Sequence, residues 1–274
     1  MSMTPQLLHL RDQKIVYYQS GNPDTTVMFL HGNSCSATTF IKQLESSLGK
    51  RIGMAAIDLP GHGLSDEAPD KSQYSLTGYA ETVKEVLIAL QIEKAVLVGW
   101  SLGGHIAMQT SAVSKRIAGI MTYGSPPLNL PLEIEPAFLP HEVIDYIFMQ
   151  DLREEDAKIF AKAFFSPHNQ NDLEPFIKNI LRTNPHARPE LGKGIHAGQY
   201  KNELDIVNEL EIPLAILHGA NEQLVNGDYY DHIHIPSLWR KRVQIIDNAG
   251  HACHWEQPEV FNSLLESFLG ECGF

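Results

Sequence analysis

Short runs of β-branched and apolar residues recur along the chain and are typical of buried strands. They lie at residues 14–19, 27–30, 52–57, 95–98, 117–123, 214–217 and 243–246. Between the third and fourth runs, apolar residues recur at helical spacing after Ser75, which is available as an N-cap. A further helix is predicted at residues 258–269. This alternation predicts a mostly parallel sheet with helices on both faces.

The alternation stops between residues 126 and 208. Prolines cluster at the start of this segment, and only helix-like pieces follow. We therefore expect a helical lid at residues 127–208, inserted after the sixth strand into a core formed by 1–126 and 209–274. An ordinary packed helical subdomain explains most of the lid's aromatic residues, but some are candidates to cover an apolar substrate pocket. The candidate substrate-binding residues are Phe138, Tyr146, Phe160 and Phe164 of the lid, with Trp100 and Ser34 of the core.

Composition and charge limit the kinds of molecule that the protein is expected to bind. The chain has 274 residues and a formal net charge of −12, without a local run of Lys or Arg, so nucleic acid and anionic membrane surfaces are poor partners. The first five residues lack a basic region followed by an apolar stretch, and no stretch approaches 18 unbroken apolar residues. Three scattered cysteines, Cys35, Cys253 and Cys272, resemble neither a disulfide framework nor a zinc site. We expect a cytoplasmic protein, a monomer or weak dimer, that acts on a small molecule.

The strongest chemical signal is the sequence GWSLG at residues 99–103, between a predicted strand and a predicted helix. A serine at so sharp a turn adopts strained backbone angles, and its neighbours two residues away must be small. Gly99 and Gly103 meet that need. This pattern predicts that Ser101 is a nucleophile at the catalytic edge of the sheet.

A serine hydroxyl needs a base to remove its proton, and histidine serves near neutral pH. His251 lies in a loop between the last predicted strand and the last predicted helix, from which it can reach the catalytic edge. His31 and His62 lie in glycine-flanked loops, where turn geometry and local hydrogen bonds explain them. We expect His251 to be the base.

The base needs an acid that fixes its tautomer. Glu222 follows the strand at 214–217 and is the only carboxylate in its loop before Asp228, which is the alternative. The order Ser101, Glu222, His251 is the order expected on a sheet of this kind. Attack by the serine produces a tetrahedral intermediate with a negative oxygen, which needs hydrogen-bond donors. The expected donors are the backbone N–H groups of Leu102 and Asn33, and the Asn33 side chain is a candidate for a further contact.

These motifs together resemble the α/β-hydrolase superfamily: HGN at 31–33, DLPGHGLS at 58–65, GWSLGG at 99–104 and NAGHA at 248–252. The resemblance implies an α/β-hydrolase fold with a mostly parallel eight-stranded sheet and a helical lid. Within the superfamily, HGNSCS, GWSLGGHI and DNAGHA are most similar to the serine-dependent N-acyl-homoserine lactone lactonases, which quench quorum sensing. Such lactonases often present a lid tyrosine hydroxyl near the lactone, and Phe160 stands at that position here.

The resemblance implies a hydrolase that needs no cofactor and no metal. The segment Asp231-His232-Ile233-His234 superficially resembles a metallo-lactonase cluster, but the further Asp-His pair of that cluster is missing. Two histidines that alternate on such a segment are more often solvated or packed.

Several functions remain open alongside the lactonase. A carboxylesterase acting on short-to-medium-chain acyl esters is the main alternative, and peroxidase-like and carbon–carbon hydrolase activities also occur with this triad. Epoxide hydrolases and dehalogenases carry an aspartate where this chain has Ser101. A ligand-sensing receptor that turns over slowly is a rival from another class, and the intact serine motif favours catalysis over it.

Overall fold

The computed structural model describes residues 3–10, 12–21 and 24–274. The expectation that the first residues carry no export signal falls partly on Met1 and Ser2, which lie outside the described residues. Among the described residues, no helix has the length and apolar character needed to span a bilayer. Cys35, Cys253 and Cys272 are all buried and free.

Eight strands form one sheet in the order β1-β2-β4-β3-β5-β6-β7-β8. The pairs β1–β2 and β2–β4 are antiparallel, and the other neighbours are parallel. This confirms the predicted mostly parallel sheet. The strands are β1 Gln6–Leu10, β2 Gln13–Ser20, β3 Thr25–Leu30, β4 Gly53–Ile57, β5 Ala95–Trp100, β6 Ile117–Tyr123, β7 Leu214–Gly219 and β8 Gln244–Ile246.

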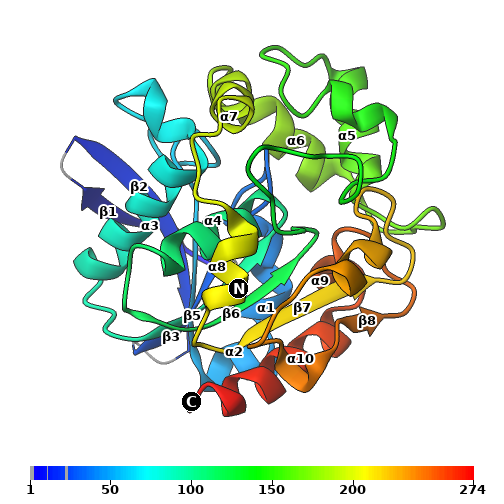
Figure 1. The fold of residues 1–274 in the computed structure, drawn as a ribbon. Coiled ribbons are helices and arrows are strands. Elements are labelled where there is room, and N and C mark those ends of the chain that lie inside the picture. The colour runs from blue at the N-terminus through cyan, green and yellow to red at the C-terminus, as the bar shows by residue number, and fades with distance from the viewer. Residues whose placement is uncertain (1–2, 11, 22–23) are drawn as a thin grey trace.

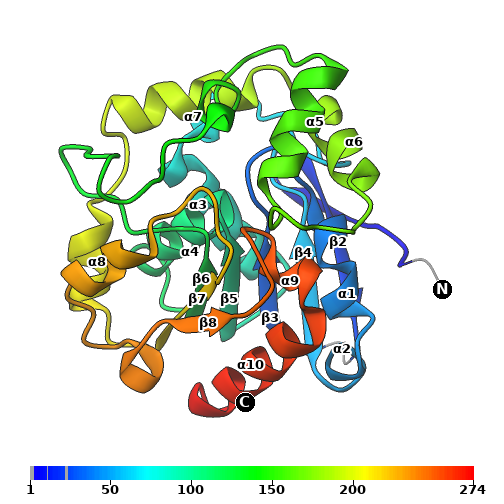
Figure 2. The same ribbon diagram turned by 90° about the vertical axis from the view of Figure 1, so that its right-hand side faces the viewer.

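Helices cover both faces of the sheet (Figure 1). They are α1 Ile41–Leu44, α2 Ser47–Arg51, α3 Leu76–Ala89, α4 Leu102–Ser111, α5 Glu154–Ala163, α6 Glu174–Arg182, α7 Ala187–His196, α8 Glu203–Glu209, α9 Cys253–Glu256 and α10 Pro258–Glu271. Short 3-10 helices lie at Ala37–Phe40, Lys71–Tyr74, Glu142–Asp145, Gly227–His232 and Trp239–Lys241. In Figure 2, α3, α4 and α8 lie on one side of the sheet and α1, α2, α9 and α10 on the other, with α5, α6 and α7 together above it.

The core consists of two apolar layers, one on each face of the sheet. On β3, Val27 and Phe29 belong to one layer, and Met28 and Leu30 belong to the other. Successive strand residues point to opposite faces, so a strand covered on both sides is apolar throughout. This explains why the central strands appear in the sequence as continuous apolar runs.

The segment between β6 and β7 carries α5, α6 and α7, as the break in alternation predicts. The short helix α8, at the end of this segment, contacts α4 of the core. The lid boundaries at residues 127 and 208 stay a prediction.

The strand β1 is absent from the predicted elements, because its residues are mostly exposed and do not alternate between apolar and polar.

The helix α3 begins where the sequence predicts. The Ser75 hydroxyl accepts the Gly78 N–H at 3.1 Å and so caps the first turn, whose N–H groups have no partner within the helix. The apolar face of α3 packs on the layer that contains Met28 and Leu30. The cap therefore fixes the start of a helix that covers one face of the sheet.

We predict that Ser75→Ala lowers the free energy of unfolding by about 1 kcal/mol, because the Gly78 N–H loses its acceptor. Equilibrium urea unfolding measures this change. Ser267→Ala, at an exposed position within α10, is the matched control and should change stability by less than about 0.5 kcal/mol. Equal effects of the two substitutions would contradict a capping role for Ser75.

Candidate active site

Ser101 lies at the turn between β5 and α4, with φ 52° and ψ −119°. This is strained backbone for a residue with a side chain. The Ser101 N–H donates to the Tyr123 carbonyl at 2.9 Å, and the Ser101 carbonyl accepts the Ser125 hydroxyl at 2.7 Å. Hydrogen bonds on both sides of the residue therefore hold the strained turn in place.

Three glycines make this turn possible. A Cβ at Gly99 would collide with the Gly103 carbonyl, and a Cβ at Gly103 would collide with the Leu30 carbonyl. A Cβ at Gly104 would collide with the Ser125 hydroxyl. The sequence analysis predicted this need at Gly99 and Gly103. Gly104 is required for a contact that only the fold creates.

His251 and Glu222 form a buried pair. The distance from His251 Nδ1 to Glu222 Oε2 is 2.8 Å, and the two side chains are 3% and 2% exposed. The other carboxylate oxygen of Glu222 accepts the N–H groups of Gln223 and Leu224 at 2.9 and 2.8 Å. Asp228, the alternative acid, is exposed. The structure thus brings Glu222, the first choice of the sequence analysis, to His251.

Electrostatics fix the roles in this pair. Burial raises the pKa of Glu222, but the charge and hydrogen bond of His251 and the N–H of Leu224 lower it more, so the pKa lies below its usual value. An ionised carboxylate only accepts hydrogen bonds, so His251 donates from Nδ1. In the neutral ring, Nε2 is then the acceptor. This is the tautomer that a general base needs.

The loop that carries His251 is held by backbone contacts. The Gly250 N–H donates to Glu256 at 2.7 Å, and Glu256 also accepts the hydroxyl and N–H of Ser166. The Ala252 N–H donates to the Phe164 carbonyl at 2.6 Å. These contacts attach the loop on both sides of His251 to the end of α5, so the lid segment helps to place the ring.

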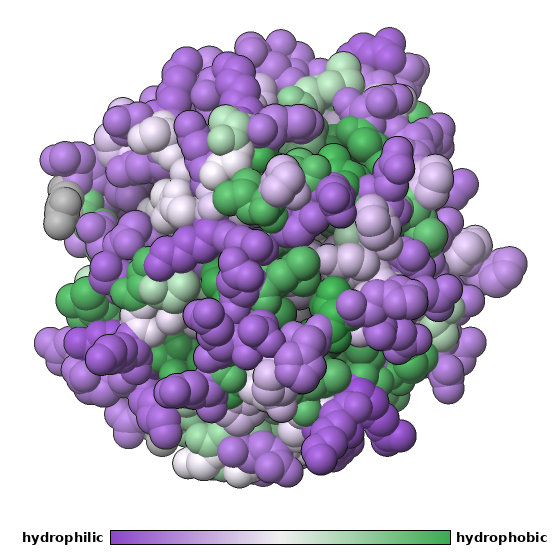
Figure 3. All heavy atoms as spheres, viewed as in Figure 1, coloured by the Kyte–Doolittle hydropathy of each residue, from purple (hydrophilic) through white to green (hydrophobic). Residues whose placement is uncertain are grey.

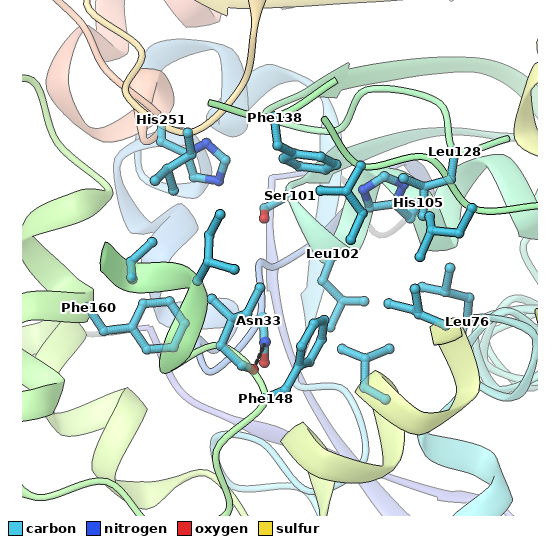
Figure 4. Close-up of a pocket in the computed structure, with 18 of the residues that line it drawn as sticks. Asn33, Leu76, Ser101, Leu102, His105, Leu128, Phe138, Phe148, Phe160 and His251 are labelled. Atoms are coloured by element: carbon cyan, nitrogen blue, oxygen red, sulfur yellow. Dashed lines mark hydrogen bonds between the residues drawn. The ribbon is translucent and has the colours of Figure 1, made fainter. Parts of the chain in front are cut away.

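Ser101 and His251 line one cavity of about 160 Å³. Figure 4 shows the His251 ring turned toward the Ser101 hydroxyl. Leu102, the first residue of α4, and Asn33 also line this cavity. The N–H of Leu102 has no partner within its helix, because the first N–H groups of a helix never do. The structure therefore brings four of the predicted site residues to the same space.

The Asn33 side chain has a different contact from the one considered in the sequence analysis. Its amide nitrogen donates to the Ile147 carbonyl at 2.7 Å, and its oxygen accepts the Ser34 hydroxyl at 3.2 Å. Ser34 in turn accepts the buried Arg188 guanidinium at 3.2 Å. Arg188 also donates to carbonyls of the segment 149–150, and burial lowers its pKa to about 10. The turn at 31–34 is therefore bound to the lid segment at two points.

Of the candidate substrate-binding residues, Phe138, Phe160 and Phe164 line the cavity, and Trp100, Ser34 and Tyr146 are not among its described lining residues. Trp100 is fully buried beside Ser101, and its ring packs against those of Phe164 and His254. Sequence analysis missed most of the lining. The additional residues are Leu76, His105, Leu128, Leu132, Ile134, Val143, Ile144, Ile147, Phe148, Leu191, Ile195, His196 and Leu224.

One signal for these residues was present in the sequence. His105 lies in the first turn of the helix that directly follows Ser101, which keeps the two residues close together. The others come from distant segments. Figure 3 shows hydrophobic residues gathered near the middle of one face, with hydrophilic residues around them. Ile134 and Ile144 are 40% exposed and also line the cavity, so the cavity reaches the surface at this segment.

Asp231, His232 and His234 are exposed, as expected for solvated residues of that segment. Among the residues that the structure describes, no three or more His, Cys, Asp or Glu side chains form a group able to hold a metal ion. His31 bonds to the Gly32 carbonyl at 2.8 Å and His62 to the Pro60 carbonyl at 3.0 Å, which are the local hydrogen bonds that their loops predict. His31 also accepts the N–H of Leu59, 28 positions away, at 3.0 Å.

The fold and this site define a hydrolase of the α/β class. The sequence profile of the alpha/beta hydrolase family matches residues 27–264, and the chain belongs to that family. The resemblance to N-acyl-homoserine lactonases is also confirmed. The chain matches structures of N-acyl homoserine lactonase AidH, one with N-butanoyl homoserine and one, of a mutant, with N-hexanoyl homoserine lactone. Both matches have a TM-score of 0.93. The complex with N-butanoyl homoserine is 32% identical over 98% of this chain and 97% of its own. The mutant complex is 31% identical over 98% of this chain and 98% of its own.

Curated relatives are more distant. The AB hydrolase superfamily protein YisY of Bacillus subtilis is 26% identical over 88% of this chain and 90% of its own length. A 2-hydroxy-6-oxononadienedioate/2-hydroxy-6-oxononatrienedioate hydrolase of Paraburkholderia phymatum is 24% identical over 94% of this chain and 91% of its own length. Both matches extend over nearly the whole chain.

We predict that Gly124→Ala displaces the His251 ring. Gly124 has φ +65°, and a Cβ there would collide with His251 Cε1. Hydrolysis of a chromogenic ester should fall by at least about tenfold, with a loss of stability of about 1 kcal/mol or more from the backbone angle.

The matched control is Gly270→Ala in α10, where a Cβ would meet nothing within 4 Å. This substitution should keep full activity and leave stability unchanged or slightly higher. Full activity of a folded Gly124→Ala variant would show that the placement of His251 does not depend on this glycine.

Proposed function

We propose that this hydrolase opens the lactone ring of N-acyl-homoserine lactones through a serine acyl-enzyme. Ser101 is the nucleophile, His251 the base and Glu222 the acid that orients it. The observation that carries the proposal is the buried His251–Glu222 pair, whose histidine lines the same apolar cavity as Ser101 at its strained turn. The likeness to AidH, whose structures contain N-hexanoyl homoserine lactone and N-butanoyl homoserine, supports this substrate class.

The mechanism follows from the proton positions. His251 Nε2 takes the proton of the Ser101 hydroxyl as the oxygen attacks the lactone carbonyl carbon. The N–H groups of Asn33 and Leu102 hold the negative oxygen of the tetrahedral intermediate. When the ring C–O bond breaks, His251 returns the proton to the leaving alkoxide. Water, activated by the same ring, then releases the acyl-homoserine and restores Ser101.

The cavity suits an acyl chain. Its volume of about 160 Å³ is close to that of an apolar cavity that accepts one benzene molecule, about 150 Å³. An acyl chain of about six carbons has a similar bulk. Aliphatic and phenylalanine side chains form most of the lining, so burial of the chain is favourable by about 0.8 kcal/mol for each methylene.

The carbon–carbon hydrolase relative suggests a different reaction, and the cavity disfavours it. The name of that relative specifies a dioate, a substrate with two carboxylates. Buried carboxylates need cationic partners. The described lining of this cavity contains no Lys or Arg. A neutral acylated substrate therefore fits better, either a lactone or, as the alternative, a simple carboxylic ester.

We predict that the wild-type protein converts N-hexanoyl-homoserine lactone to its ring-opened acid faster than the lactone opens spontaneously. Mass spectrometry of the ring-opened acid measures both rates. Ser101→Ala should show no opening above the spontaneous rate. Glu222→Gln should reduce kcat by roughly 10³-fold or more, because the wrong His251 tautomer is favoured.

Asp228→Asn, at the exposed acid of the same loop, is the matched control and should keep full activity. Cleavage of simple esters without opening of the lactone would assign the carboxylesterase function instead. Opening that persists in Ser101→Ala would exclude the serine mechanism.

We also predict a chain-length optimum. Values of kcat/KM should rise by up to about tenfold from butanoyl to hexanoyl lactone and stop rising beyond about six carbons, where the cavity is full. Phe160→Ala, which removes a lining ring, should move the optimum to longer chains.

Phe165→Leu is the control for this shift, since Phe165 is buried beside α5 and is not among the described lining residues. It should lower stability and leave the chain-length profile unchanged. A continuous rise to dodecanoyl lactone in the wild type would show that the cavity does not limit the chain.

A further inference from the structure

A second buried histidine–carboxylate pair borders the same cavity. His105 Nδ1 lies 2.8 Å from Glu203 Oε2, and their side chains are 10% and 0% exposed. His105 comes from α4, one turn after Ser101, and Glu203 is the first residue of α8. Figure 4 shows His105 on the opposite side of Ser101 from His251. The proposed nucleophile therefore lies between two histidines, each held by a buried glutamate.

Protein groups occupy both oxygens of Glu203. The Leu128 N–H donates to Oε2 at 2.9 Å, and the Gln109 amide donates to Oε1 at 3.2 Å. Among the described residues, no Lys or Arg forms an ion pair with Glu203. Burial of a carboxylate without a cationic partner is costly, and well-packed apolar residues are often at least as stable. The pair is therefore poorly explained by stability alone.

The hydrogen-bond roles identify what His105 offers the cavity. Both oxygens of Glu203 accept hydrogen bonds from other groups, so His105 donates to Glu203 from Nδ1 and Nε2 is left as an acceptor. No described residue is hydrogen-bonded to Nε2. Each of the other polar groups that line the cavity has another proposed role, another hydrogen-bond partner or an exposed position. Ser101 and His251 are the proposed catalytic residues, the Asn33 amide is bonded to Ile147, and His196 is exposed.

We propose that His105 Nε2 accepts the amide N–H of an N-acylated lactone, and that this contact selects such substrates over lactones and esters without an N–H. The inference rests on the proposed lactone opening. A buried amide N–H without an acceptor would be unfavourable in so apolar a cavity, so the acceptor favours substrates that carry the donor. Glu203 is a positioning residue that fixes the ring and its tautomer.

The spacing agrees with this substrate. The His105 N–H lies 3.4 Å from the Ser101 carbonyl, and both residues line the cavity, so a small substrate can contact both side chains. In an N-acyl-homoserine lactone, the amide nitrogen is one carbon away from the attacked carbonyl carbon, about 2.5 Å. A lactone whose carbonyl carbon lies at Ser101 therefore has its amide N–H in the same part of the cavity, where it can donate a hydrogen bond of about 2.9 Å to His105 Nε2.

The test compares two lactones that differ in one group. N-hexanoyl-homoserine lactone carries the amide N–H, and its ester isostere carries an oxygen there. Ring opening is measured by mass spectrometry. The wild type should prefer the amide by about tenfold or more in kcat/KM. In His105→Leu, kcat/KM for the amide should fall by about that factor, and kcat/KM for the isostere should stay within about threefold.

Two variants separate recognition from structure. His105→Gln can donate to Glu203 and still accept from the substrate, so it should retain part of the preference. Gln109→Met removes a donor to Glu203 and leaves His105 in place, so its preference should equal that of the wild type. A structural role alone would make Gln109→Met resemble His105→Leu.

His105→Leu leaves Glu203 buried without its histidine and can unfold the protein. The double variant His105→Leu with Glu203→Leu removes both groups and should fold, as its thermal melt will show. An amide preference that persists in a folded variant without His105 overturns this inference alone. Failure of the wild type to open either lactone overturns the proposed function together with it.

Discussion

The strained backbone of Ser101 is the constraint on which the rest of the site depends. Its angles, φ 52° and ψ −119°, lie in a region that residues with a side chain rarely adopt. Such a conformation persists only when the surrounding structure over-determines it. Here the carbonyl of Tyr123, the hydroxyl of Ser125 and the close approach of Leu30 do so. These three contacts come from neighbouring strands, so the order of the strands is what makes the turn stable.

This dependence explains which parts of the site are readable in the sequence. The turn needs glycines at fixed positions, and the loops after β7 and β8 carry the proposed acid and the proposed base. Ser101, Glu222 and His251 were therefore predictable as neighbours from local patterns and chain order. The strands and α3 were predictable for a similar reason, because apolar periodicity and an N-cap at Ser75 are local properties.

The cavity wall was not predictable in the same way. It is built from side chains of α3, α4, α7 and the irregular segment 128–148, and no local pattern brings these together. Trp100 illustrates the difficulty, since its neighbour Ser101 faces the cavity while the Trp100 ring packs against those of Phe164 and His254. The pairing of His105 with Glu203, 98 positions away, likewise depends on how α8 packs on α4.

The lid segment is part of the site rather than a cover over it. Asn33 and Ser34, which form the proposed oxyanion turn, are hydrogen-bonded to Ile147 and Arg188 of the lid segment. On the other side, the loop of the proposed base is bonded to the end of α5. These hydrogen bonds are buried or part-buried, so a movement of the lid segment that broke them would be unfavourable. The lid segment that surrounds the cavity thus also holds the proposed oxyanion turn and the proposed base in position, so the shape of the cavity and the geometry of the proposed catalytic groups depend on the same packing.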